Sequence, residues 1–73
     1  MNPLHPKKLL HGKWTAVQPV AREKHFIVTA VVEPERPGGP VEWVEIESVH
    51  SGRSRRLAWR ALRDSAVWRQ GWV

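Results

Sequence analysis

The arginines in the last third of the chain carry the clearest chemistry. A guanidinium group can grip two phosphate oxygens at once and can stack on a base. Five of these arginines lie within eleven residues, namely Arg53, Arg55, Arg56, Arg60 and Arg63. Three lysines near the amino terminus can reach the same region if the first residues pack against the domain, namely Lys7, Lys8 and Lys13. This pattern predicts a basic surface that contacts an anion, and nucleic acid is the most concrete candidate.

Aromatic rings supply the second part of this hypothesis. A strand that displays arginines beside an exposed ring suits single-stranded nucleic acid, because unpaired bases stack on such rings. If any of the five tryptophans is exposed, Trp14 and Trp43 are the rings that we expect to contact bases. The hypothesis is therefore contact with single-stranded nucleic acid or its phosphate backbone. Arginine and tryptophan are also enriched at the hot spots of protein interfaces, so composition does not separate the two functions. A module that docks an acidic protein partner is therefore the alternative.

The remaining polar residues do not form a known catalytic or metal-binding pattern. Four histidines lack the spacing of a zinc site, and the chain has no cysteine; they are His5, His11, His25 and His50. None of the four serines lies in a Gly-x-Ser-x-Gly elbow, and Gly38 and Gly39 lie among prolines rather than before a helix. The sequence therefore predicts a non-enzymatic protein without a metal site or a cofactor.

Charge is unevenly distributed along the chain. The net charge is +4 over residues 1–25, −4 over residues 26–50 and +5 over residues 51–73, which gives +5 in total. One interpretation is that the two basic ends form an anion-binding surface together. The other is that the acidic middle pairs with the ends in cross-strand ion pairs, each of which contributes little to stability.

The length of 73 residues sets the domain organisation. Residues 1–12 contain two prolines and no clean period, so we expect an extended amino-terminal arm, with Leu9 and Leu10 tucked under the sheet. Residues 13–73 then form one small domain whose large indole rings replace the missing disulfides. The absence of cysteine, of an apolar run of ~20 residues and of a signal-peptide pattern predicts a cytoplasmic protein without membrane contact.

Alternating and β-branched residues predict four strands, at residues 13–18, 24–33, 41–49 and 54–59. The segment rich in proline and glycine between the second and third strands is expected to be a loop.

The end of the chain carries the residues that typically begin and end a helix. Asp64 is suited to an N-cap and Gly71 to a helix stop, so one or two helical turns are expected over Ser65 to Gln70. Residues 71–73 are then expected to add a last short strand. The fold class is mainly β, a small SH3-like or Tudor-like barrel of four to five antiparallel strands with one short C-terminal helical turn. A four-stranded antiparallel sheet with a C-terminal helix is the alternative.

Apolar residues on the predicted strands and near the end of the chain define the expected core. They are Phe26, Val28, Val44, Ile46, Leu57, Trp59, Leu62, Trp68 and Trp72. Large aromatic side chains bury about 150 to 250 Å² each, so a short chain gains most from covering them.

Three blocks of sequence resemble a family of small bacterial tryptophan-rich proteins of uncharacterised function. They lie at residues 5–19, at residues 23–29, and at residues 59–64 together with 68–72. The resemblance implies a stand-alone bacterial domain and transfers no catalytic or binding residue. Trp43 lies in a stretch that varies in this family, so the resemblance assigns it no shared role.

Overall fold

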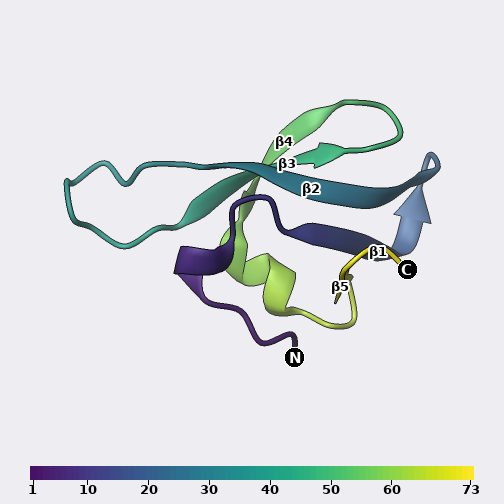
Figure 1. Cartoon of the computed structure of the whole chain (residues 1–73), viewed down its shortest axis with the longest axis horizontal. Coiled ribbons are helices and arrows are strands. Elements are labelled where there is room, and N and C mark those ends of the chain that lie inside the picture. The colour runs from purple at the N-terminus through teal and green to yellow at the C-terminus, as the bar shows by residue number, and fades with distance from the viewer.

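The computed structural model describes all 73 residues and forms a single antiparallel sheet with two short 3-10 turns (Figure 1). The strands are β1 (Lys13–Val20), β2 (Glu23–Val31), β3 (Trp43–Ser48), β4 (Ser54–Ala58) and β5 (Trp68–Gln70). The turns are η1 (Pro6–Lys8), before the sheet, and η2 (Trp59–Arg63), between β4 and β5.

The sheet has the order β4-β3-β2-β1-β5, so its two edge strands are the fourth and fifth in the chain. All pairings are antiparallel, and β4 does not pair with β5, so the sheet does not close. The prediction of a mainly β fold with antiparallel strands is confirmed. The alternative with four strands and a C-terminal helix is wrong, since a fifth strand is present and both helical segments are 3-10 turns.

The strands follow the predicted ranges closely, with one extension. β1 continues through Pro19 to Val20, because Val20 pairs with Glu23 at the start of β2. Residues 14–16 pair with β5, while the register with β2 shifts between Thr15 and Val20. Proline is tolerated at such an irregular position because no regular ladder hydrogen bond is required of its nitrogen.

The helix predicted over Ser65 to Gln70 is absent. Asp64 ends η2, and its side-chain Oδ1 accepts a hydrogen bond from the Ala66 N–H at 3.0 Å. Its backbone carbonyl accepts from Val67 and Trp68, which makes a tight turn. An aspartate that favours a helix N-cap favours this type of turn as well, so the same residue begins a turn here. The chain then pairs with β1 over residues 68–70, and the predicted terminal strand lies three residues earlier than expected.

Nine buried apolar residues form the core. They are Leu9, Trp14, Phe26, Val28, Val44, Ile46, Trp59, Leu62 and Trp68. Leu57 is half-buried and packs against this core, as expected.

Two tryptophans differ from the predictions, in opposite directions. Trp72, expected in the core, is 41% exposed, and its indole N–H donates a hydrogen bond to the Phe26 carbonyl at 2.9 Å. Trp14, a candidate ring for contact with bases, is only 2% exposed. Both faces of β1 carry apolar residues, so alternation alone does not show which face is covered.

The amino-terminal arm is fixed to the domain. The Asn2 side-chain amide donates to the carbonyl of Leu62 at 2.9 Å and to that of Trp68 at 2.8 Å. Leu9 is 1% exposed and belongs to the core, whereas Leu10 is 51% exposed, so only one of the two leucines is tucked in as predicted. Neither 3-10 turn is long or apolar enough to span a membrane.

Candidate functional site

The structure divides the arginine cluster into separate groups. Side chains alternate between the two faces of a strand, so Arg55 and Arg56 on β4 point to opposite sides. Arg53 and Arg55 line one cleft together. Arg60 and Arg63 lie on η2 beside a separate shallow hollow. The predicted five-arginine surface is therefore not continuous.

Arg56 faces an acidic strand. Its Cα partner on β3 is Glu45, and the Arg56 Nη2 atom lies 3.9 Å from Glu45 Oε1. This is the only ion pair within 4.0 Å in the structure, and both side chains are largely exposed, so it contributes little to stability. Of the cross-strand ion pairs that could join the acidic middle of the sequence to its basic ends, the structure therefore contains one, between Glu45 and Arg56.

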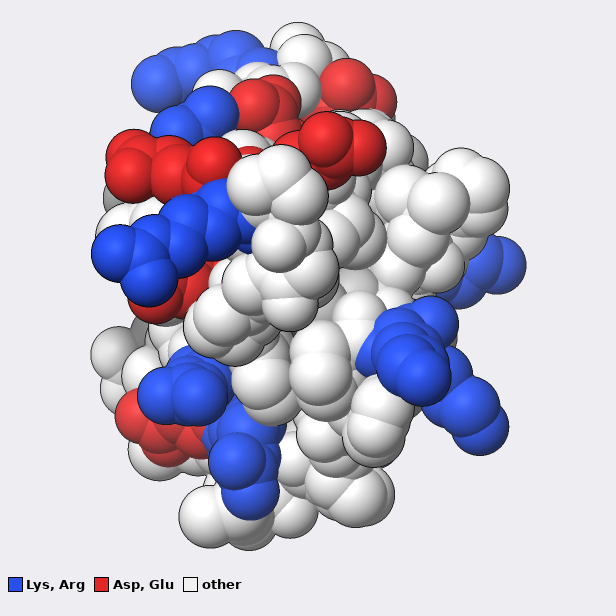
Figure 2. Space-filling model, turned by 90° about the vertical axis from the view of Figure 1, so that its left-hand side faces the viewer, with Lys and Arg blue, Asp and Glu red and all other residues white.

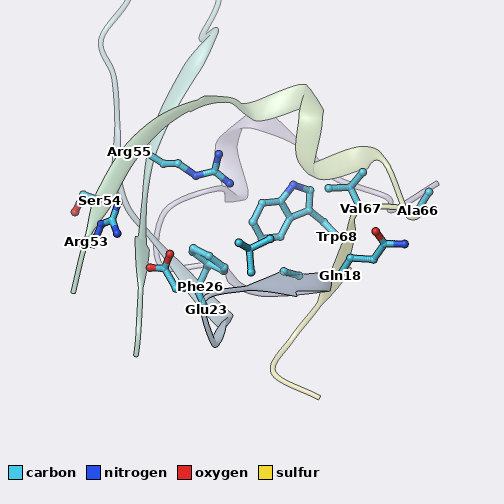
Figure 3. Close-up of a pocket in the computed structure, with 11 residues that line it drawn as sticks. Gln18, Glu23, Phe26, Arg53, Ser54, Arg55, Ala66, Val67 and Trp68 are labelled. Atoms are coloured by element: carbon cyan, nitrogen blue, oxygen red, sulfur yellow. The ribbon is translucent and has the colours of Figure 1, made fainter. Parts of the chain in front are cut away.

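The cleft that holds Arg53 and Arg55 lies where the sheet remains open (Figure 3). It has a volume of about 520 Å³ and is bounded by β1, the start of β2, the start of β4 and the segment that enters β5. Its floor contains Phe26 and Trp68, whose rings meet edge to face with centroids 5.2 Å apart and an angle of 86° between their planes. Figure 3 shows the Arg55 guanidinium extending over the cleft toward the Trp68 indole.

Glu23 is the one acidic residue that lines this cleft. Ser51 Oγ donates a hydrogen bond to its Oε2 atom at 2.5 Å. That bond, followed by one from Ser48 and by the positive charge of Arg53, lowers the pKa of the Glu23 carboxyl below its usual value. The carboxylate is thus ionised at neutral pH and held at the β3–β4 turn, and two arginines against one glutamate leave the cleft with a net positive charge.

The lowered pKa of Glu23 predicts how stability depends on pH. The folded state binds the proton of Glu23 less readily than the unfolded state, so the stabilisation is complete above about pH 4.5 and is lost as the pH falls further. We expect the difference in Tm between the wild type and Glu23→Gln to be largest at pH 7 and to shrink below pH ~4. Thermal unfolding followed by circular dichroism from pH 3 to 7 measures it, and a difference that grows in acid contradicts the assignment.

The other predicted basic residues lie outside the cleft. Lys7 and Lys8 are exposed on η1, and neither lines the cleft. The Lys13 Nζ atom lies 4.8 Å from the ring centroid of Trp72, the exposed tryptophan that was predicted to lie in the core. His25 lies on the same ring, with centroids 5.8 Å apart. Lys13 therefore contributes to a second aromatic surface rather than to the arginine pair.

Trp43 is exposed as predicted, but not beside the arginines of the cleft. Its indole is 44% exposed and lines a hollow of about 380 Å³ at the loop between β2 and β3. Charged residues of both signs share that hollow; they are Glu33, Glu35, Glu42, Arg36 and Arg56. On the face at the loop end of the molecule, Figure 2 shows blue and red side chains interleaved along the left side and blue ones among white residues on the right, so this face is not a continuous basic patch.

Several residues of the cleft could not be predicted from the sequence. Gln18, Ala66 and Val67 line it because β5 returns beside β1, a pairing between residues more than fifty positions apart. No local pattern in the sequence indicates that pairing. The histidines, in turn, do not form part of a metal site, since no group of three or more potential ligands is placed to hold a metal ion.

The fold and the candidate site together give the class of this protein. It is a small antiparallel β domain with a tryptophan-rich core and a cleft bordered by arginines. A family model described as "Tryptophan-rich protein (DUF2389)" matches residues 12–73, which include all five strands and η2. The chain belongs to this family, and the resemblance seen in the sequence is confirmed. No curated protein and no solved structure matches the chain significantly.

Proposed function

We propose that this protein is a small, non-enzymatic module that binds single-stranded nucleic acid at the cleft between β4 and β5. The observation that carries the proposal is the position of Arg53 and Arg55 over a cleft with an aromatic floor. Guanidinium groups contact phosphates and aromatic rings contact bases, which are the two parts of single-strand recognition. The order of the strands and the 3-10 turn before β5 are compatible with an SH3-like or Tudor-like barrel.

The charges of the cleft support a phosphate ligand. Neither Arg53 nor Arg55 has an ion-pair partner within 4.0 Å, so both are free to contact an anion. The overall charge of +5 favours approach to any polyanion. A bacterial, cytoplasmic setting is part of the proposal, since a cysteine-free chain suits a reducing compartment.

Arg55 and Arg56 provide a matched pair of variants, because they are neighbours on opposite faces of β4. We expect Arg55→Ala to weaken binding of a fluorescent single-stranded oligonucleotide about tenfold at low salt, and Arg56→Ala to change it less than about threefold. Each phosphate interaction that a variant removes makes the slope of log K against log salt shallower by about 0.7. Fluorescence anisotropy with RNA and DNA strands, at several salt concentrations, measures both quantities. Absence of binding at low salt, or equal effects of the two variants, contradicts the proposal.

Docking of an acidic protein segment is the second candidate, and the open sheet favours it. The outer edges of β4 and β5 have no strand partner, and an extended peptide can pair with such an edge. The same arginines would then contact glutamates of the peptide. Binding of an extended glutamate-rich peptide that is abolished in Arg55→Ala, without binding of oligonucleotides, would favour this candidate over the first.

A further inference from the structure

We infer that the cleft receives one unpaired nucleobase of the bound strand, while the arginines at its rim contact the neighbouring phosphates. This inference rests on the proposed function and adds to it the part of the ligand that enters the site. It separates two ways of binding that share the same electrostatics, namely contact with the backbone alone and insertion of a base.

The depth of the two rings carries the inference. Phe26 is 7% exposed and Trp68 is 3% exposed, and both line the cleft, so a ligand can reach only a small part of either residue, and only from within the cleft. A flat strand lying across the surface therefore cannot stack on either ring. A base that has turned out of its strand can reach them, as in other proteins that recognise unpaired bases.

The size of the cleft fits such a ligand. Its volume of about 520 Å³ lies within the range of about 300 to 1,000 Å³ that is typical of sites for small organic molecules. Small side chains on two sides keep it open, Ala16 on β1 and Ala66 in the turn before β5. Larger side chains at these two positions would fill the space above the rings.

The walls of the cleft offer both hydrogen-bond donors and acceptors. Arg55 supplies donors, Glu23 supplies acceptors, and the Gln18 amide supplies both. A nucleobase presents donors and acceptors on its edges, whereas a phosphate presents acceptors only. The mixed lining therefore fits a base better than it fits a second phosphate.

A double helix cannot use the cleft in this way. Its bases are paired and stacked, so only its phosphates reach Arg53 and Arg55 unless a base is extruded at an energetic cost. We therefore expect single strands to bind about tenfold more tightly than a duplex at the same salt concentration.

The first test uses the wild-type protein and varies the ligand. The protein is titrated with three ligands of equal phosphate number, a single strand, the corresponding strand of abasic sites and a duplex. We expect the abasic strand and the duplex each to bind about tenfold more weakly than the normal strand, because neither can place a base on the rings. A single 2-aminopurine in the normal strand should lose emission on binding.

The second test fills the cleft without changing its charge. Ala66→Phe places a ring in the cleft, while Ser65→Phe places one at the neighbouring position, which lines a different hollow. We expect Ala66→Phe to weaken single-strand binding about tenfold with an unchanged salt slope and to abolish the 2-aminopurine signal. Ser65→Phe should behave like the wild type. Thermal unfolding of both variants shows whether either one is misfolded.

The outcomes distinguish the inference from the proposed function. If the wild type binds none of the three ligands at low salt, the proposed function fails and the inference fails with it. If all three bind with equal affinity and the 2-aminopurine emission does not change, base insertion is overturned while backbone binding stands. The inference is supported by a preference for the normal strand that Ala66→Phe removes and Ser65→Phe retains.

Discussion

Replacing Trp14 with alanine is expected to lower the free energy of unfolding by about 3 to 5 kcal/mol. The indole belongs to a core of only nine residues, and Trp14 pairs with Phe26 on one side and Gln70 on the other. The Trp14→Ala variant lacks this indole, the largest type of side chain, on β1, the strand that pairs with both β2 and β5. Small domains have a total stability of about 5 to 15 kcal/mol, so the variant is expected to be close to unfolded at moderate denaturant concentrations.

Trp43→Ala is the matched control for this prediction. The Trp43 indole is nearly half exposed on β3, so its removal is expected to cost about 1 kcal/mol or less. Urea denaturation followed by circular dichroism measures both variants without relying on tryptophan emission. Similar destabilisation of the two variants would contradict the assignment of Trp14 to the core and Trp43 to the surface.

The central strands were predictable because their signal is local. β2 and β3 consist of β-branched and apolar residues bounded by turn residues, and their predicted ranges differ from the observed ones by one to two residues at each end. Val28, Val44 and Ile46 are fully buried, as expected from that pattern. The alternation of side chains along a strand depends only on backbone geometry, so the sequence pattern was sufficient to predict that these three residues are buried.

The end of the chain was harder to predict because its structure depends on a distant partner. Asp64 and Gly71 are compatible with a helix between them and with two turns that flank a strand. Pairing of Trp68 with Ala16 on β1 decides between these possibilities. Since the two residues are far apart in the sequence, no local pattern contains this information.

The candidate site was only partly predictable for the same reason. The sequence predicted the strand that carries Arg55 and Arg56, at residues 54–59. It did not indicate that β3 would place Glu45 opposite Arg56, or that Arg55 would face Trp68 across an open seam. The arginines of the candidate site were therefore predicted, whereas their grouping with the other residues of the cleft required the sheet order.

The last prediction concerns the amino-terminal arm and compares two adjacent leucines. Leu9→Ala is expected to lower the free energy of unfolding by about 2 to 5 kcal/mol, whereas Leu10→Ala is expected to change it by no more than about 0.5 kcal/mol. Leu9 is buried in the core, and Leu10 is largely exposed to solvent. The two variants remove the same atoms one position apart, so the helix and strand propensities of alanine cannot explain a difference between them. Urea denaturation of both variants measures the two values.

The large loss of stability expected for Leu9→Ala follows from how the amino-terminal arm is attached to the rest of the domain. The backbone of His11 and Gly12 exchanges hydrogen bonds with Val28 on β2, and Asn2 bridges the carbonyls of Leu62 on η2 and Trp68 on β5. Leu9 lies between these two attachments in the sequence and is one of the nine buried core residues. If both leucine variants proved neutral, the arm would be an accessory segment, and residues 12–73, the range of the family match, would suffice for the fold.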